Sequence, residues 1–203
     1  LALLAVNCYA RTIICPCPTS GSSSAACDQQ CQQQQRGALI GLYQAWGGAN
    51  WSHRDGWMSN QDHCQWLGVS CCPTNSSTTF LSVPQWTAQD AWQLVDPCNC
   101  CCSTPGAVGA LQLPSNNVSG NFTALQSATA LSSSLLLLTL ESNLLEGPLD
   151  SIGHFPQLQG VYLAQNALTG TIPSSVGNLV ALRVFNVEYN MLSGTLPDAL
   201  LQL

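Results

Sequence analysis

The last half of the chain repeats with a period of about 24 residues. Residues 158–179 read LQGVYLAQNALTGTIPSSVGNL, and residues 182–203 read LRVFNVEYNMLSGTLPDALLQL. Asn166 and Asn190 are 24 residues apart, and Asn143 precedes Asn166 by 23. Such a period indicates a solenoid, in which each unit buries its apolar side chains against the neighbouring units.

Each unit has the pattern L-x-x-L-x-L-x-x-N-x-L-x-G-x-I/L-P, which is typical of a leucine-rich repeat. Two weaker units precede the clear ones, at residues 111–122 and 135–149, with about three extra residues in a loop at 127–134. Alternation such as Val161-x-Leu163 predicts a short strand with one face inward. We therefore expect a short right-handed α/β-type solenoid of about four repeats over residues 107–203, with a parallel β-sheet on its concave face.

Two residue types recur in every unit for structural reasons. An inward asparagine at the turn can satisfy backbone groups of its own coil and of the neighbouring coil. A glycine suits the tight turn that follows. We expect no catalytic or binding role for Asn116, Asn143, Asn166 and Asn190, nor for Gly120, Gly147, Gly170 and Gly194.

The repeat endings Gly170-Thr171-Ile172-Pro173 and Gly194-Thr195-Leu196-Pro197 resemble the plant-type subfamily of leucine-rich repeats. Residues 38–71, with N-W-S, G-W and C-x-W-x-G-V-x-C elements, resemble the N-terminal cap of secreted plant-type and protist leucine-rich repeat proteins. The resemblance covers about residues 37–72 and 107–203. It implies an extracellular recognition or scaffolding module without catalysis, and a disulfide between Cys64 and Cys71.

The cap can also be interpreted from its residues alone. Leu39, Leu42, Tyr43 and Trp46 lie at helical spacing, and Gly47-Gly48 provides a stop. This disulfide-rich cap at residues 37–72 would cover the first coil. We expect the indole rings to form a packed wedge in it rather than a ligand platform, namely those of Trp51, Trp57 and Trp66.

Two further segments lie outside the cap and the repeats. Residues 1–36 are rich in Cys, Ser and Gln, and we expect residues 19–35 to be irregular. The first ten residues could be the tail of a signal peptide, but we favour a retained segment. Residues 73–106 form a Cys-rich insertion with a short helix expected after residues 87–90. The insertion is either a determinant of partner specificity or a surface flap.

Twelve cysteines in 203 residues indicate an oxidising, extracellular compartment. The pairing of the ten cysteines other than Cys64 and Cys71 cannot be read from their spacing. The alternative, a zinc site, lacks the usual C-x2-C spacing and is disfavoured. Four N-x-[ST] sequons predict N-linked glycans, with Asn75, Asn117 and Asn121 favoured over Asn50.

The scarcity of charge excludes some classes of partner. The chain has no lysine, four arginines and ten acidic residues, for a net charge of −6. It therefore has no basic patch for nucleic acid. No run approaches the ~20 apolar residues of a membrane span. The three histidines, His53, His63 and His154, accompany no recognisable nucleophile, and we expect no enzyme, cofactor or metal site.

The outward residues of the predicted strands form three columns on the concave face. They start at Ala110, Gln112 and Pro114 and are small, neutral and partly apolar. A peptide or a glycan could bind there, and an unused solvated surface is the alternative. The expected contacts are Tyr162, Asn186, Glu188, Tyr189 and Glu141.

The last repeat also predicts a binding surface. Leu203 lies at the same phase of the repeat as Leu179, so an end at this coil exposes its inner leucines. A protein partner or further copies of the chain would cover them, and head-to-tail stacking could propagate into a filament. We expect a non-catalytic extracellular glycoprotein for protein interaction or scaffolding, with a receptor-like or inhibitor-like ectodomain as the alternative.

Overall fold

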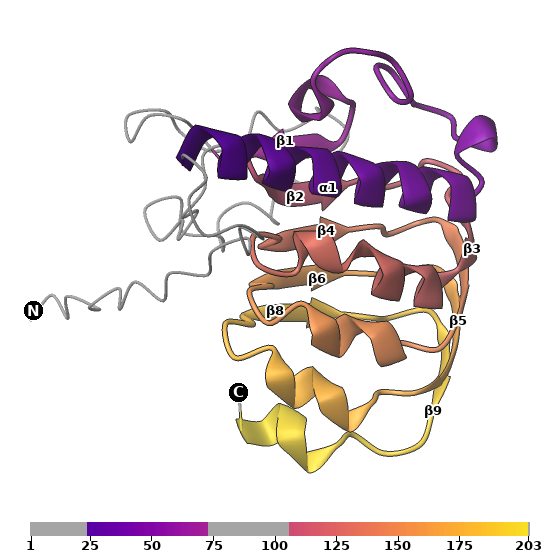
Figure 1. The fold of residues 1–203 in the computed structure, drawn as a ribbon. Coiled ribbons are helices and arrows are strands. Elements are labelled where there is room, and N and C mark those ends of the chain that lie inside the picture. The colour runs from indigo at the N-terminus through magenta and orange to yellow at the C-terminus, as the bar shows by residue number, and fades with distance from the viewer. Residues whose placement is uncertain (1–23, 73–105, 203) are drawn as a thin grey trace, which may run out of the picture.

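The computed structural model of this protein describes residues 24–72 and 106–202. The expectations for residues 1–23 and for the insertion at 73–105, including Asn75, lie outside these ranges. The described residues form a solenoid in which α1 lies across the top and the coils follow beneath it (Figure 1). From the top of the view downward, the strands of one sheet succeed one another in the order β1, β2, β4, β6 and β8.

The strands predicted from the alternating pattern form one sheet. Each coil contributes one strand, and β2, β4, β6 and β8 pair in parallel. Ala110 pairs with Leu137, Leu137 with Gly160, and Gly160 with Val184, which confirms the predicted column. The strands are β2 (Val108–Gln112), β4 (Leu137–Thr139), β6 (Gly160–Tyr162) and β8 (Val184–Asn186).

A second parallel sheet follows the asparagine turns and was not predicted. Its strands show no alternation of apolar and polar residues, and each contains or adjoins a glycine or a polar residue at the turn. Gly147, for example, has a φ of 83°, which disfavours other residues. The strands are β3 (Ser119–Asn121), β5 (Leu144–Gly147), β7 (Ala167–Thr171) and β9 (Met191–Ser193).

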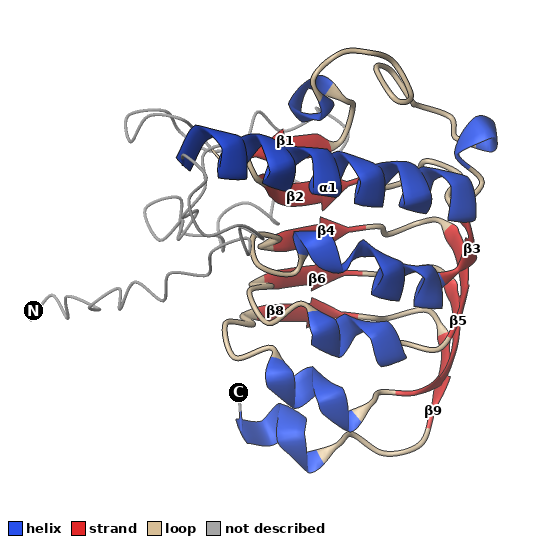
Figure 2. Ribbon diagram, viewed as in Figure 1, coloured by secondary structure: helices blue, strands red, loops and turns tan. Residues whose placement is uncertain are grey.

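Short 3-10 helices complete the coils and stack below α1 (Figure 2). The first of them is twice as long as the others, with a kink at Ala128. It takes up most of the 127–134 segment that was expected to be a loop, so the extra residues of the first coil lengthen a helix. The helices are η4 (Phe122–Leu131), η5 (Asp150–His154), η6 (Ser174–Asn178) and η7 (Asp198–Gln202).

The repeated asparagines form a ladder of hydrogen bonds between coils, as predicted. Asn143 Oδ1 accepts from the backbone N–H groups of Asn116 and Val118 at 3.0 and 2.9 Å. Its Nδ2 donates to the carbonyls of Leu113 and Leu140. Asn166 and Asn190 repeat this arrangement one and two coils further on. The asparagines are therefore structural: each one satisfies buried backbone groups of two coils.

The first asparagine of the series connects the solenoid to the cap instead. Asn116 Oδ1 accepts from the backbone N–H of His53 at 2.6 Å, and its Nδ2 donates to the His53 carbonyl at 2.8 Å. The cap consists of α1 (Ser24–Ala45), η1 (Gly48–Asn50), η2 (His63–Gln65) and β1 (Val69–Cys71). Strand β1 pairs antiparallel with β2 and ends the sheet.

The expectation of irregular structure at residues 19–35 is wrong from Ser24 onward, because α1 starts there. Glutamine is a good helix former, and tertiary contacts anchor this part of the helix. Gln35 is buried, accepts from the Val108 N–H at 2.8 Å and donates to Ser134 Oγ at 2.9 Å. The expected boundary between residues 36 and 37 thus falls inside α1.

The tryptophans of the cap form the predicted wedge. The rings of Trp51 and Trp57, and those of Trp57 and Trp66, lie 5.0 Å apart between centroids. All three side chains are buried. Trp51 Nε1 donates to the Trp46 carbonyl, and Trp57 Nε1 donates to the Leu67 carbonyl. These rings are thus part of the core and are not accessible as a stacking platform.

Candidate functional site

The sequence-predicted contacts Asn186, Glu188 and Tyr189 meet in one groove of about 520 Å³ on the last coil. Strand β8 and the turn after it position these residues. Tyr162 is paired with Asn186 on the neighbouring strand, so it lies beside this groove. The other lining residues are apolar inner positions or the ladder asparagine of the repeat, namely Ile172, Phe185, Val187, Asn190 and Leu192.

The inner apolar side chains of the last coil are partly open to solvent. Val161, Leu163 and Leu168, in the coil before, are fully buried. Phe185, Val187 and Leu192, at the equivalent positions, are half-buried. Leu196 is 61% exposed. The sequence predicted that inner apolar side chains of the last coil would be exposed, but not that they would line a groove. We did not predict that these apolar residues line the same groove as Asn186, Glu188 and Tyr189. That arrangement depends on the position of the turn after β8.

The concave face is accessible over fewer coils than expected. The outward residues Ala110, Gln112, Leu137 and Thr139 of the first two coils are all buried. Ala110 and Leu137 form a small apolar cluster against which Tyr162 packs. The expectation of a face open along four coils is therefore wrong: among the described residues the accessible part begins at Glu141 and continues over the last two coils.

Partial burial shifts the pKa values of two residues on the concave face, Glu141 and Tyr162. Partial burial raises the pKa of the Glu141 carboxyl. Burial also raises the pKa of Tyr162, and the charge of Glu141 acts in the same direction. A half-desolvated carboxylate next to a tyrosine hydroxyl gives this part of the face an acidic character that would favour a cationic or hydrogen-bond-donating partner group.

The cap contains the disulfide that the family resemblance implied. Cys64 and Cys71 are bonded, with their Cα atoms 5.4 Å apart, and Cys31 and Cys72 also belong to disulfides. His63, Cys64 and Cys71 place their potential ligand atoms within 4.8 Å of one another. Both sulfur atoms belong to the disulfide, however, and zinc binds thiolates. Among the described residues this group therefore does not fit a metal.

His63 makes the stability of the protein depend on pH. Burial lowers the pKa of this imidazole, Asp62 opposes the shift, and Arg36 adds to it. Between the lowered pKa and about 6.5 the unfolded chain binds a proton that the folded chain does not, so stability falls as the pH falls through this range. We expect the melting temperature to drop less between pH 7 and pH 5 in His63→Gln than in the native protein. Equal drops in calorimetric scans would contradict this assignment.

The described sequon asparagines are accessible for glycosylation. Asn50, Asn117 and Asn121 are exposed. Asn117 Nδ2 donates to the Asn50 carbonyl at 2.9 Å, and Asn121 Oδ1 accepts from the Thr123 N–H at 2.9 Å. An N-linked sugar leaves the amide oxygen and one amide hydrogen in place, so both hydrogen bonds are compatible with a glycan. Their occupancy stays a prediction.

Comparison with known proteins agrees with this architecture. A model of the family described as Leucine Rich Repeat matches residues 157–179 and 181–203. The fold is a leucine-rich repeat solenoid. No match was found among curated proteins. The first two coils have the same repeat structure, since their strands continue the parallel sheet and their asparagines belong to the same hydrogen-bond ladder.

Several solved plant ectodomains have a similar structure. A chain of the BIR3–SERK2 complex from Arabidopsis thaliana is 23% identical, with a TM-score of 0.52 over 80% of this chain and 72% of that one. The SOBIR1 receptor kinase ectodomain from the same plant is 23% identical, with a TM-score of 0.55 and coverages of 80% and 70%. At this identity the likeness shows the leucine-rich repeat fold alone.

A third match comes from the Arabidopsis receptor kinase HAESA in complex with the peptide hormone IDA and the co-receptor SERK1. It is 24% identical with a TM-score of 0.51, over 84% of this chain and 23% of the matched chain. Within the described residues, no helix is both long enough and apolar enough to cross a bilayer.

Proposed function

We propose that this protein is a non-catalytic extracellular module that binds another protein through the last coil of its solenoid, and that a second copy of the chain can occupy this surface. The groove of about 520 Å³ on that coil carries the proposal. It combines the polar contacts Asn186, Glu188 and Tyr189 with apolar inner positions of the repeat. Groups of this kind, apolar at the centre and polar at the rim, are typical of protein interfaces.

The partial exposure of the last coil favours an apolar partner surface. Leu196 and the half-buried Phe185 and Leu192 leave apolar area in contact with water. Val161 and Leu168, the equivalents of Phe185 and Leu192 in the coil before, are fully buried. Covering it stabilises the complex by the hydrophobic effect, at roughly 25 cal/mol for each Å² removed from water. A ligand without apolar side chains would leave this contribution unused.

Backbone groups at the same edge favour a partner that presents a strand or a leucine-rich coil. The N–H of Leu145 donates to Asn166 Oδ1, and that of Leu168 donates to Asn190 Oδ1, each one coil further on. Leu192 is the equivalent residue of the last coil, so its N–H faces the position of a further ladder acceptor. Strand β8 likewise lies at the edge of its sheet, where a partner strand can be added.

The two ends of the solenoid are not equivalent, which bears on the mode of self-association. The first coil is covered by α1 and by the antiparallel strand β1. Head-to-tail stacking would require that cap to move, so the filament that such stacking could form is disfavoured. Two last coils can instead meet around a two-fold axis, and such an isologous contact closes at a dimer.

The positions of the sequons and the solved structures are compatible with this surface. Asn50, Asn117 and Asn121 lie in the cap and the first coil, and the last two repeats contain no N-x-[ST] sequon. Glycans would therefore leave the last coil free. The receptor kinase HAESA, whose fold is similar, was solved in complex with a peptide hormone and a co-receptor. Receptor-like binding of a protein or peptide is therefore the natural alternative for the same groove.

The test is sedimentation of the full chain over a range of concentrations. We expect a concentration-dependent dimer and no larger species. Leu196→Glu should weaken dimerisation by about tenfold or more, because it replaces an apolar contact with a charge that must be desolvated. Tyr189→Ala should weaken it as well.

Leu144→Glu is the matched control. Leu144 is 57% exposed, similar to Leu196, but it lies on β5 in the second coil. It should dimerise like the native chain. A native protein that stays monomeric at all concentrations would refute the second copy as the occupant. Equal effects of the Leu144 and Leu196 substitutions would refute the last coil as the interface.

A further inference from the structure

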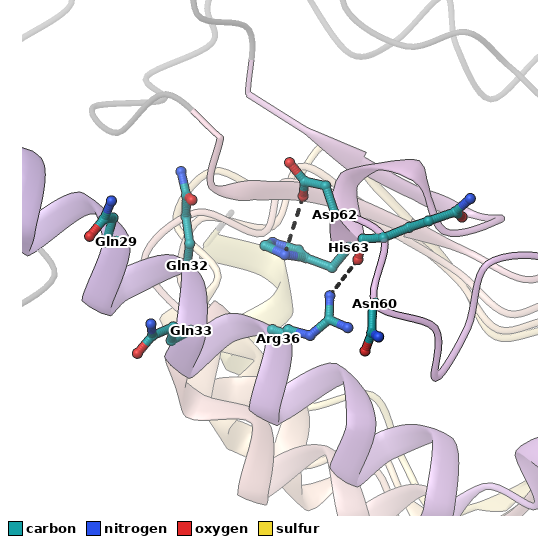
Figure 3. Close-up of a pocket in the computed structure, with 8 residues that line it drawn as sticks. Gln29, Gln32, Gln33, Arg36, Asn60, Asp62 and His63 are labelled. Atoms are coloured by element: carbon teal, nitrogen blue, oxygen red, sulfur yellow. Dashed lines mark hydrogen bonds and ion pairs between the residues drawn. The ribbon is translucent and has the colours of Figure 1, made fainter.

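A second cleft lies in the cap, at the opposite end of the solenoid from the groove on the last coil. It has a volume of about 560 Å³ and runs between one face of α1 and the loop before η2 (Figure 3). Every described residue that lines it has a polar side chain, and five of the eight carry a carboxamide. The carboxamides belong to Gln29, Gln32, Gln33, Asn60 and Gln61.

The α1 side of the cleft is a continuous stripe. Gln29 and Gln33 are four residues apart, as are Gln32 and Arg36, so the two pairs lie side by side on one helix face. Arg36 fixes the opposite loop to this face: its guanidinium lies 4.6 Å from the centre of the Trp66 ring and donates to the carbonyls of Gln61 and Ser59. Because the loop is held by these contacts, the cleft is preformed.

A buried polar atom at this cleft has no hydrogen-bond partner among the residues that the structure describes. His63 is 4% exposed and lines the cleft, and its Nε2 is buried without a hydrogen bond. Its Nδ1 lies 3.5 Å from Asp62 Oδ1, which orients the ring. A buried polar atom without a partner is costly and rare in folded proteins. The cost is removed if a ligand hydroxyl bonds to Nε2, which requires a small displacement of the side chains that cover this atom.

The chemistry of the lining selects among ligand classes. Carboxamides offer a donor and an acceptor side by side, which suits adjacent hydroxyl groups. The one arginine and the one aspartate of the lining balance in charge, which disfavours a strongly charged ligand. The described lining contains neither an apolar side-chain pocket nor a sheet edge, the features by which peptides are commonly recognised.

We propose that this cleft binds a neutral oligosaccharide, with the carboxamides of α1 and of residues 60–61 bonding to its hydroxyl groups and His63 Nε2 bonding to one of them. The sugar can be a free oligosaccharide or part of a glycan attached to a protein. This site is independent of the last coil, so either assignment can fail without the other.

The experiment titrates the full, deglycosylated chain with neutral tri- and tetrasaccharides built from glucose, galactose, mannose or N-acetylglucosamine. Side-chain amide and imidazole nitrogen signals are followed by NMR. We expect at least one sugar to shift the carboxamide signals of the cleft and the His63 Nε2 signal. Gln29→Ala/Gln33→Ala should weaken its binding by about tenfold, since two hydrogen-bonding groups are lost. A glycopeptide bearing the same sugar shows whether an attached glycan also binds.

Gln30→Ala/Gln34→Ala is the matched control. These glutamines are also exposed on α1, one residue further along, and do not line the cleft. The control pair has the same composition and the same gain in helix propensity, and its affinity should stay within about twofold of native. The proposal is overturned if no sugar of the panel shifts these signals, if both pairs weaken binding equally, or if the unglycosylated peptide binds as well as the glycopeptide.

Discussion

Replacing Asn143 with alanine is expected to cost about 3–5 kcal/mol of unfolding free energy, a large part of the stability of a domain of this size. The side chain is buried and connects two coils. Its loss leaves the N–H groups of Asn116 and Val118 and the carbonyl of Leu113 buried without these partners. Urea denaturation at neutral pH under oxidising conditions measures the effect.

The other asparagines provide an internal scale for this experiment. Asn190 bonds to backbone groups in the same way, but it is only half-buried in the last coil. Asn190→Ala should therefore cost clearly less than Asn143→Ala. Asn178 is exposed with a single long hydrogen bond of 3.5 Å, and its replacement should change stability by no more than about 0.5 kcal/mol. A similar loss at all three positions would contradict the ladder as the source of the effect.

Gly68→Ala is expected to destabilise the protein by about 2–5 kcal/mol, through backbone strain and a steric clash. Gly68 has a φ of 80°, in the left-handed region that costs other residues about 1–2 kcal/mol. An added Cβ would also collide with the Gln112 carbonyl oxygen and approach Leu113 Cδ2 at 2.8 Å. The Gln112 N–H donates to the Gly68 carbonyl at 2.7 Å, so the backbone cannot move apart without losing this bond.

Gly37→Ala serves as the opposite control. Gly37 lies inside α1, is exposed, and would place a Cβ where nothing is within 4 Å. The substitution should stabilise the protein by about 0.5–1 kcal/mol, because alanine loses less conformational freedom in a helix. Thermal unfolding of both variants would show opposite shifts. A loss at Gly37, or a neutral Gly68→Ala, would show that local packing around these glycines differs from the structure described.

The parts of the fold that were predicted correctly are those governed by local pattern. The strand alternation around Val161 and Leu163, the ladder asparagines and the positive-φ glycines all depend on neighbours within one repeat. The second sheet was missed because its strands, such as β9, lie at the glycine turns and carry no alternating apolar pattern. The start of α1 was missed because Gln35 is held by Ser134 and Val108, which lie 99 and 73 residues further along the chain.

The candidate sites divide in a similar way. Asn186, Glu188 and Tyr189 were predicted as contacts, and the structure places all three in the groove of the last coil. The burial of Gln112 and Thr139 on the same sheet was not predictable from their own repeat. The polar cleft of the cap was also missed. The spacing of Gln29, Gln33 and Arg36 was a helical signal for it, but this segment was expected to be irregular.

The sequence by itself determined the repeat architecture, the role of the asparagines and the wedge of tryptophans, since each follows from local spacing or from a period of about 24 residues. Only the tertiary structure decided which surfaces are accessible. The exposure of a residue depends on everything that packs over it. Leu168 and Leu192 occupy the same position of the repeat, yet Leu168 is buried and Leu192 lines the groove. Among the described residues, the coil of β8 packs on Leu168, and no described coil packs on Leu192.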